Sequence, residues 1–382
     1  MDGTINPGQF NYFQAVTKLM SEESPDGDPR IIVCTPVPLW RLREKHVDHL
    51  DNLAQFFADL EVEPEVYLAG DYHIAAIHQR ERASGSTEWH LTEGGGGAFQ
   101  HPVHNLDRMI PNSYGGLAEP KVAEDAPFRL LTSWPSNRES REGSGSWWDL
   151  LLDKAAFPLV ATLAALQVPA MVLAGSDHRG GDENLRSFTE TVLDDLVPFG
   201  GLTSVILILI AMFGLASSSS SARGALVWAR YVGFSHGVIQ AGVFLAARVF
   251  GNLAVRATTA GLDGLSSTVV AWLTLIGAGA LAAVGSIVVL GSYLRFANRH
   301  FRMHDNESYS ARHSGDNRHF ARFRITPDGT LECFVVAIRR TGSDWVSSLR
   351  ADRPGPPSDM SPPELINVGF RVEPRVSRKS AT

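Results

Sequence analysis

Asp71 and His73 stand in a loop that directly follows an apolar run. The run covers residues 66–69 and ends at Gly70. The end of a buried strand fixes the backbone, and the loop beyond it projects side chains outside the sheet, which is how many metal sites begin. A carboxylate oxygen together with an imidazole nitrogen suits Zn, Mn or Fe. The pattern therefore predicts a metal site at Asp71 and His73. The alternative interpretation is an ordinary polar loop after a strand.

A run of glycines and a pair of histidines follow this loop. Glycine has no Cβ, so its backbone can approach a ligand or a metal-bound phosphate closely. The proline between the histidines fixes one φ angle but does not make them ligands. The alternative interpretation of the glycine run is a flexible loop. The residues expected to line a substrate or phosphate pocket are Gly94, Gly95, Gly96, Gly97, His101 and His104.

Two motifs of this region resemble those of a known family. They are the GDYH turn at 70–73 and the run GGGGAFQHPVH at 94–104. Together they resemble the C-terminal motif region of calcineurin-like metallophosphoesterases, and most closely a membrane-attached bacterial group. Residues 9–13, 31–40 and 304–310 also resemble segments of that group, so the resemblance covers most of the chain. It implies a two-metal phosphoesterase site with Asp71 and His73 among its ligands.

The chain departs from the family pattern in its first half. The family has D-x-H, GD and GNH motifs there, which supply most of the metal ligands and the histidine that protonates the leaving group. No GNH occurs in this sequence, and no D-x-H precedes Gly70. The turn at Thr35-Pro36 also lacks a histidine that many such enzymes have. We therefore expect an incomplete metal site, completed by a missing N-terminal segment or by a partner chain that also pairs with the open edge of the sheet.

Long uncharged stretches predict a membrane region. Of the 382 residues, 44% are hydrophobic. About 20 apolar residues span a bilayer. Four transmembrane helices are expected near 155–176, 198–217, 228–250 and 267–292; the alternative is that one or two of them are buried core helices. Trp147 and Trp148 suit an interfacial anchor ahead of the first helix. His236, inside the third, is expected to pack through a hydrogen bond or to belong to a polar site.

Charge distribution predicts an orientation and excludes one class of partner. The first 30 residues hold no apolar signal segment, and arginines concentrate between the second and third helices and after the fourth. By the positive-inside rule, both termini face the cytoplasm. The front of the chain is acidic, which argues against nucleic-acid binding, and the basic end could lie on anionic lipid. Cys34 and Cys333 fall in separate expected strands and lack metal-type spacing, so a reduced compartment is the simpler interpretation.

The expected fold is a partial calcineurin-like α/β layer, a four-helix transmembrane region and a small C-terminal β element. Expected helices cover 9–20 and 41–60, and expected strands cover 30–35, 65–69, 89–92 and 128–132. Residues 318–325 and 330–338 flank Pro327-Asp328-Gly329, which is a hairpin signal. The expected regions are a phosphoesterase-like domain at 1–132, a linker at 133–150, membrane helices within 151–294, a cytoplasmic hairpin region at 295–345 and a disordered tail at 346–382.

The function expected from these features is a membrane-bound metal-dependent hydrolase of phosphate esters, inactive in this incomplete form. Its cofactors would be divalent Mn, Fe or Zn, and its partners a phosphoester and membrane lipid. A non-catalytic membrane scaffold or regulator with a degenerate phosphoesterase domain is the first alternative. A small transporter is the second alternative, although His236 is the only ionisable residue expected at mid-membrane.

Overall fold

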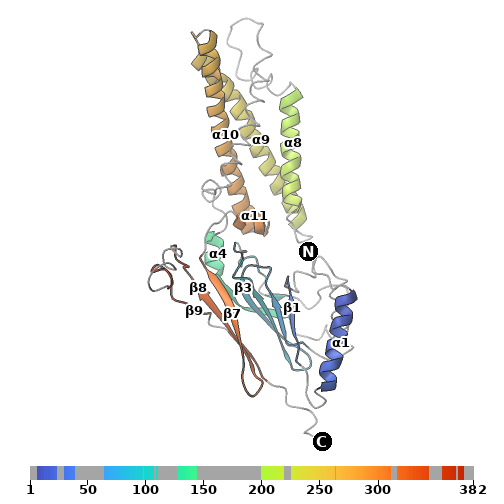
Figure 1. Ribbon diagram of the computed structural model, residues 1–382. Coiled ribbons are helices and arrows are strands. Elements are labelled where there is room, and N and C mark those ends of the chain that lie inside the picture. The colour runs from blue at the N-terminus through green and yellow to red at the C-terminus, as the bar shows by residue number, and fades with distance from the viewer. Residues whose placement is uncertain are drawn as a thin grey trace. The chain divides into compact units, whose positions relative to one another are not determined.

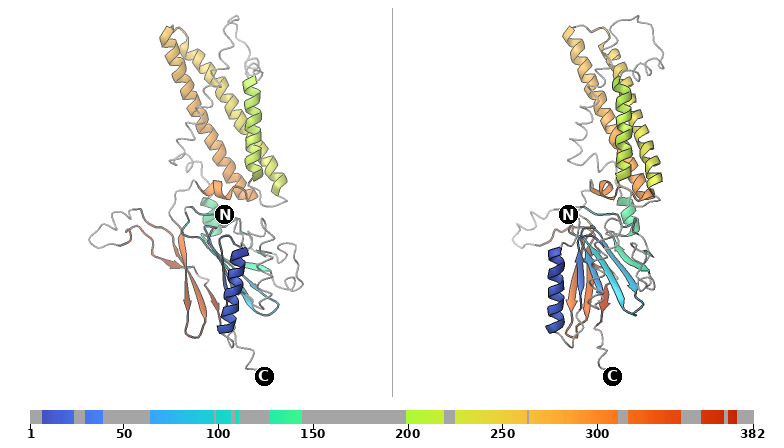
Figure 2. Two further views of the ribbon diagram at one scale, coloured as in Figure 1. Left: turned by 45° about the vertical axis from the view of Figure 1, so that its right-hand side comes forward. Right: turned by 90° about the vertical axis from the view of Figure 1, so that its right-hand side faces the viewer.

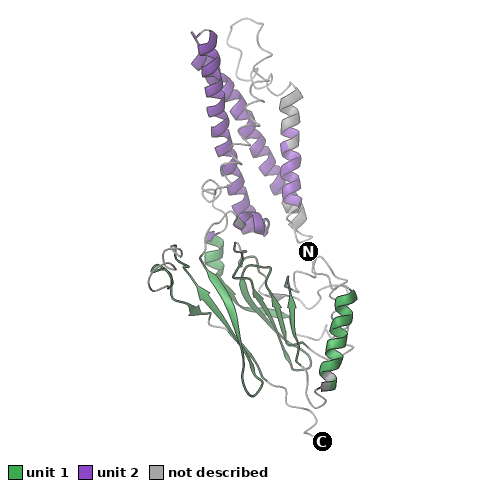
Figure 3. Cartoon of the chain, viewed as in Figure 1, with its two compact units in different colours: residues 1–142, 314–382 green, residues 143–313 purple. Residues whose placement is uncertain are grey.

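The computed structural model describes part of the chain, and the described parts belong to two compact units (Figures 1 and 3). The first unit holds residues 1–142 and 314–382, and the second holds residues 143–313. The described residues are 7–23, 30–38, 64–97, 99–106, 109–110, 127–143, 199–218, 225–262, 264–310, 316–343, 355–366 and 369–373. The helices expected at 41–60 and 155–176 lie outside the described residues.

A six-stranded mixed sheet forms one layer of the first unit (Figure 2). Its strands are β1 (Ile32–Thr35), β2 (Val66–Ala69), β3 (Ala75–Glu81), β4 (Thr87–Glu93), β5 (Met109–Ile110) and β6 (Phe128–Trp134). They lie in the order β1-β2-β4-β3-β6-β5. Strands β1, β2 and β4 run parallel, whereas β3 and β5 pair antiparallel with their neighbours. The carboxyl ends of β1, β2 and β4 therefore meet at one edge of the sheet.

Two helices among the described residues accompany this sheet. Helix α1 (Pro7–Glu23) confirms the helix expected at 9–20, and its Phe10 packs against Val33 of β1. Helix α4 (Asn137–Gly143) follows β6 directly, and Ser136 caps it through a mutual hydrogen bond with Glu139. The linker expected at 133–150 is thus wrong over its first part, because β6 and α4 occupy it.

A smaller antiparallel sheet forms the second layer. It contains β7 (Arg318–Ile325), β8 (Leu331–Ile338), β9 (Glu364–Leu365) and β10 (Phe370–Val372), with β8 between β7 and β10. The expected hairpin is confirmed: Gly329 at its turn has a φ of 82°, and Ile325 pairs with Leu331. The expected disordered tail is wrong at β9 and β10, which pair with β8. Strands this short carry too little alternation to be read from sequence.

The two sheets share one hydrophobic core. Alternate residues of β8 are buried, and Trp89 of β4 stacks on Phe370 of β10 with ring centroids 4.9 Å apart. The main buried members of this core are Val66, Ile77, Leu91, Trp134, Leu331, Cys333, Val335 and Phe370. The C-terminal strands are therefore the second layer of the front domain, not a separate β element. The fold is mixed α/β, with a partly parallel sheet.

The described part of the second unit contains helices α8 (Phe199–Ser218), α9 (Ala225–Thr259), α10 (Gly264–Phe301) and α11 (Asp305–Ser310). Among the described residues, the two segments Arg230–Thr259 and Gly264–Phe301 are long and apolar enough to cross a membrane, and Ile208–Ser217 is a shorter apolar stretch. Both long helices extend beyond the limits expected from sequence. Helices α8 and α9 approach closely at Gly233, where a Cβ would lie 2.3 Å from Cβ of Ala216.

Candidate functional site

The loops after β1 and β2 are fixed to each other at the carboxyl edge of the parallel strands. The carbonyl oxygen of Pro36 accepts the N–H groups of Gly70 at 3.2 Å and of Asp71 at 2.7 Å. Asp71 is exposed, and its carboxylate makes no hydrogen bond with the described residues. The loop therefore presents a free carboxylate on a backbone that neighbouring strands hold in place.

His73 is held at both its backbone and its ring. Its N–H donates to Nδ1 of His101 at 2.9 Å, and its ring Nδ1 donates to the carbonyl oxygen of Phe99 at 2.7 Å. Since Nδ1 carries the proton, Nε2 carries the lone pair. Nε2 makes no hydrogen bond with the described residues. A metal-binding histidine characteristically donates its other ring nitrogen to a carbonyl or carboxylate in this way.

His101 and His104 are buried and hold loops together. Besides accepting the His73 N–H, His101 donates its own N–H to the His73 carbonyl at 3.2 Å, and its ring stacks on Tyr72 with centroids 4.4 Å apart. His104 lies further along, with its Nδ1 2.8 Å from the hydroxyl of Ser140 in α4. His101 thus belongs to the cluster around His73, and His104 does not. That either residue lines a phosphate pocket stays a prediction.

At three of the four glycines, another part of the chain lies too close to the backbone to leave room for a side chain. A Cβ at Gly94 would lie 2.4 Å from the Gly70 carbonyl oxygen, one at Gly95 1.8 Å from the His319 carbonyl oxygen, and one at Gly97 2.2 Å from the His73 ring. Gly96 is different, because nothing lies within 4 Å of its Cβ position. Its N–H makes no hydrogen bond with the described residues. Of the run, Gly96 alone presents a free N–H at an open position.

Glu93 and His319 form a pair at this edge that the sequence did not reveal. Glu93 is the last residue of β4, and its Oε1 accepts hydrogen bonds from Nδ1 of His319 and, at 3.3 Å, from the N–H of Gly95. The adjacent Arg318 donates to the carbonyl oxygens of Gly95 and Gly97. The pair lies 226 residues apart in sequence. No local spacing links the two, and only the packing of β7 against β4 brings them together.

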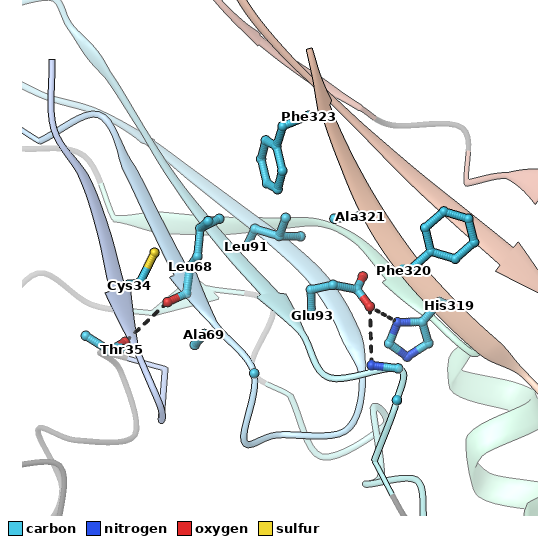
Figure 4. Close-up of a pocket in the computed structure, with 13 residues that line it drawn as sticks. Cys34, Thr35, Leu68, Ala69, Leu91, Glu93, His319, Phe320, Ala321 and Phe323 are labelled. Atoms are coloured by element: carbon cyan, nitrogen blue, oxygen red, sulfur yellow. Dashed lines mark hydrogen bonds and ion pairs between the residues drawn. The ribbon is translucent and has the colours of Figure 1, made fainter. Parts of the chain in front are cut away.

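A pocket of about 440 Å³ lies beside this pair (Figure 4). It is lined by the ends of β1, β2 and β4, by the glycine turn and by β7. Cys34 lines it and is a free, exposed thiol, whereas Cys333 is a free thiol in the core between the sheets. Burial, with the nearby charge of Glu93, raises the pKa of Cys333 to about 12. Both thiols are free in the structure, and the reduced compartment expected from the sequence stays a prediction.

Two other histidines, His78 and His90, lie in the interior of the sheet. Glu88 accepts hydrogen bonds from Nε2 of His90 at 2.6 Å and from Arg80 and Arg82. Burial raises the pKa of Glu88, but the hydrogen bond and charge of His90 and the charges of the arginines outweigh it, so the pKa lies far below its ordinary value. His78 pairs with His90 across β3 and β4 and is also buried. These residues stabilise the sheet.

Two described histidines of the second unit have packing partners. His236 stacks on Tyr293 with centroids 4.0 Å apart, and its Nε2 lies 3.2 Å from the Gln240 amide. Nε2 of His304 lies 2.7 Å from the Tyr293 hydroxyl. Ser308 of α11 donates to the carbonyl of Leu294 in α10. The segment that resembled a family motif at 304–310 therefore fastens α11 to the end of α10.

Within the described parts of the chain, no group of three or more His, Cys, Asp or Glu side chains could hold a metal ion. Asp71 and His73 are accordingly two candidate ligands on one loop. Comparison with known proteins finds no matching family model, no similar curated protein and no similar solved structure. The functional argument therefore depends on the geometry of this chain.

Proposed function

We propose that this chain supplies part of the centre of a membrane-bound metal-dependent phosphoesterase, with Asp71 and His73 as ligands for divalent Mn, Fe or Zn. The observation that supports this most strongly is the state of the His73 ring. Its Nδ1 is committed to the Phe99 carbonyl at 2.7 Å, and its Nε2 has no hydrogen-bond partner among the described residues. A free carboxylate stands two residues away on the same loop. This donor set suits these metals.

We assign metal binding, positioning of the loop and phosphate binding to different residues of this site. A bound divalent metal would polarise the phosphate and lower the pKa of a coordinated water. Asp71 and His73 would hold the metal, and His101 would fix the loop through the hydrogen bonds that its ring Nδ1 and its N–H make to the His73 backbone. The free N–H of Gly96 would donate to a phosphate oxygen, as turn N–H groups do at anion sites. The sequence predicted phosphate contacts for all four glycines of the run, whereas the proposal assigns this contact to Gly96 alone.

Other ligands are needed for catalysis. Among the described strands, β1 pairs with β2 alone, and its Ile32 is 43% exposed. An unpaired edge of this kind accepts a further strand from another segment or chain. We propose that such a strand adds to β1 and brings the remaining ligands to the edge where Thr35, Gly70 and Asp71 already lie. The chain alone then binds a phosphoester weakly and does not hydrolyse it.

The test uses the whole chain in lipid nanodiscs, with Mn²⁺ and the chromogenic substrate bis(p-nitrophenyl) phosphate. We expect metal-dependent binding of the diester, no release of p-nitrophenol, and loss of binding in His73→Ala. Absence of metal-dependent binding contradicts the proposed function. Turnover by the wild type that disappears in His73→Ala contradicts the claim that the site is incomplete in this chain. It supports the assignment of phosphoesterase activity to the site.

A non-catalytic scaffold or regulator is the second candidate function. The observation that favours it is that the described residues contain no group of three or more His, Cys, Asp or Glu side chains that could hold a metal ion. A scaffold has no need for a free Nε2 on a ring fixed in this orientation. Equilibrium dialysis decides between the two, because a scaffold takes up no stoichiometric transition metal.

A further inference from the structure

The pocket beside Glu93 and His319 is apolar along most of its wall. Leu68 and Leu91 contribute from the first sheet, and Phe323 contributes from β7 (Figure 4). Its volume of about 440 Å³ lies within the range of pockets that hold small organic molecules, about 300–1,000 Å³. Walls of this kind favour a hydrocarbon or aromatic group over a bare phosphate.

One polar atom in this pocket lacks a partner. Glu93 uses Oε1 for both of its hydrogen bonds, to His319 and to the N–H of Gly95. Its Oε2 is buried and has no hydrogen-bond partner among the described residues. In Figure 4 this oxygen points away from the His319 ring. A buried carboxylate oxygen left unpaired is destabilising, and a ligand with an O–H or N–H donor would satisfy it once the Glu93 side chain turns this oxygen toward the pocket.

The glycine turn connects this pocket to His73. The position of a Cβ on Gly95 lies 2.6 Å from Nδ1 of His319, and that of a Cβ on Gly97 lies 2.2 Å from the His73 ring. Residues i and i+2 have Cα atoms at most about 7 Å apart. The two imidazoles therefore flank the same turn, and Gly96, with its free N–H, lies between them. A phosphoester whose phosphate lies near His73 can therefore place its organic group in the pocket beside His319.

We propose that the pocket receives the organic group of the phosphoester, and that this group is apolar and carries one hydroxyl donor directed to Oε2 of Glu93. The substrate class is then an ester of phosphate with an apolar alcohol that keeps a second, free hydroxyl. The inference rests on the proposed function for the position of the phosphate. The selectivity of the pocket for a hydroxyl donor can be tested without metal and without turnover.

Cys34 provides the measurement. The chain has two cysteines, of which Cys34 lines the pocket and is exposed, whereas Cys333 is buried in the core. Alkylation of the native chain by N-ethylmaleimide, followed by intact mass, therefore reports occupancy of the pocket at Cys34. Modification of Cys333 reports unfolding. The probes are 2-phenylethanol, which has the donor, and its methyl ether, which has the same apolar body and no donor, both at matched free concentrations in nanodiscs.

We expect 2-phenylethanol to protect Cys34 at a concentration about tenfold lower than the ether, as expected for a hydrogen bond to a charged group. In Glu93→Gln the alcohol should lose most of this advantage while the ether is unchanged. Collapse of the pocket would weaken both probes equally and would expose Cys333. Equal protection by the two probes, or protection by neither, overturns the inference.

A third probe separates this inference from the proposed function. With Mn²⁺ present, 4-(hydroxymethyl)benzyl phosphate, which keeps a free hydroxyl, should protect Cys34 better than its parent alcohol 1,4-benzenedimethanol does, and His73→Ala should remove the gain. Protection by the alcohol without any metal-dependent gain for its phosphate ester overturns the proposed function and the assignment of the pocket to a substrate. The hydroxyl selectivity at Glu93 would then stand alone.

Discussion

His73 and Gly97 depend on each other at the scale of single residues. The His73 ring occupies the place where a side chain at Gly97 would stand, with its Cγ and Cδ2 2.2 Å from the Cβ position. Glycine is therefore required there by packing against a ligand candidate, and not by chain flexibility. Gly96 faces open space one residue earlier and offers a matched control.

Gly97→Ala should displace the His73 ring from the Phe99 carbonyl and weaken binding of Zn²⁺ or Mn²⁺ at least about tenfold, the lower range seen when the support of a metal ligand is lost. Gly96→Ala should leave metal affinity unchanged, because its new methyl group meets no atom within 4 Å. Isothermal titration of both variants measures this. Equal affinities in the two would show that the ring orientation does not matter to metal binding.

Glu88 gives a prediction for stability and pH. Glu88→Gln leaves the buried charges of Arg80 and Arg82 without their carboxylate, and breaking a buried ion pair costs about 3–5 kcal/mol. The folded-state pKa of Glu88 lies below its ordinary value of 4.5, so its stabilisation is complete above that pH and is lost as the pH falls toward the folded-state pKa. The difference in unfolding free energy between wild type and variant should therefore shrink below about pH 4.5. A difference that stays constant from pH 7 to pH 3 would argue against this account.

At the scale of elements, strands β9 and β10 close the core although they lie beyond a polar stretch of chain. Phe370 of β10 is 4% exposed and stacks on Trp89, whereas Leu365 of β9 is 59% exposed. Phe370→Ala should cost about 3–5 kcal/mol of unfolding free energy, and Leu365→Ala should change little. Chemical denaturation followed by Trp fluorescence measures both. An unfolding free energy that is unchanged in Phe370→Ala would show that this segment does not contribute to the stability of the core.

Sequence patterns predicted the elements that carry a simple signal. Strands β1, β2, β4 and β6 were expected from short apolar runs, and the β7–β8 hairpin was expected from its Pro-Asp-Gly turn. Strand β3 was missed, because its buried positions include His78 and its inner face therefore does not look apolar. Asp71 and His73 could be predicted as candidate ligands because they lie on one short loop, and their role stays a prediction. Glu93 and His319 could not be found, because sheet packing alone joins them.

At the scale of the whole molecule, we propose that the chain is an integral membrane protein whose termini face the cytoplasm. Two described helices have the length and composition to span a bilayer, and the arginines of the sequence favour this orientation. The substrates would then be cytoplasmic or inner-leaflet phosphoesters. A periplasmic-type reporter should be inactive when fused after Ser146 or Arg302 and active within residues 177–195. Activity after Ser146 would reverse the orientation and change the pool of substrates.

Metal uptake by the purified whole chain tests the central claim most directly. After dialysis against Zn²⁺ or Mn²⁺, elemental analysis should find stoichiometric metal in the wild type, a strong reduction in Asp71→Asn and loss in His73→Ala. His104→Ala, at a histidine bonded to Ser140 and outside the cluster around His73, serves as the control and should retain the metal. Metal bound equally by the wild type and His73→Ala, or bound by neither, would contradict the account.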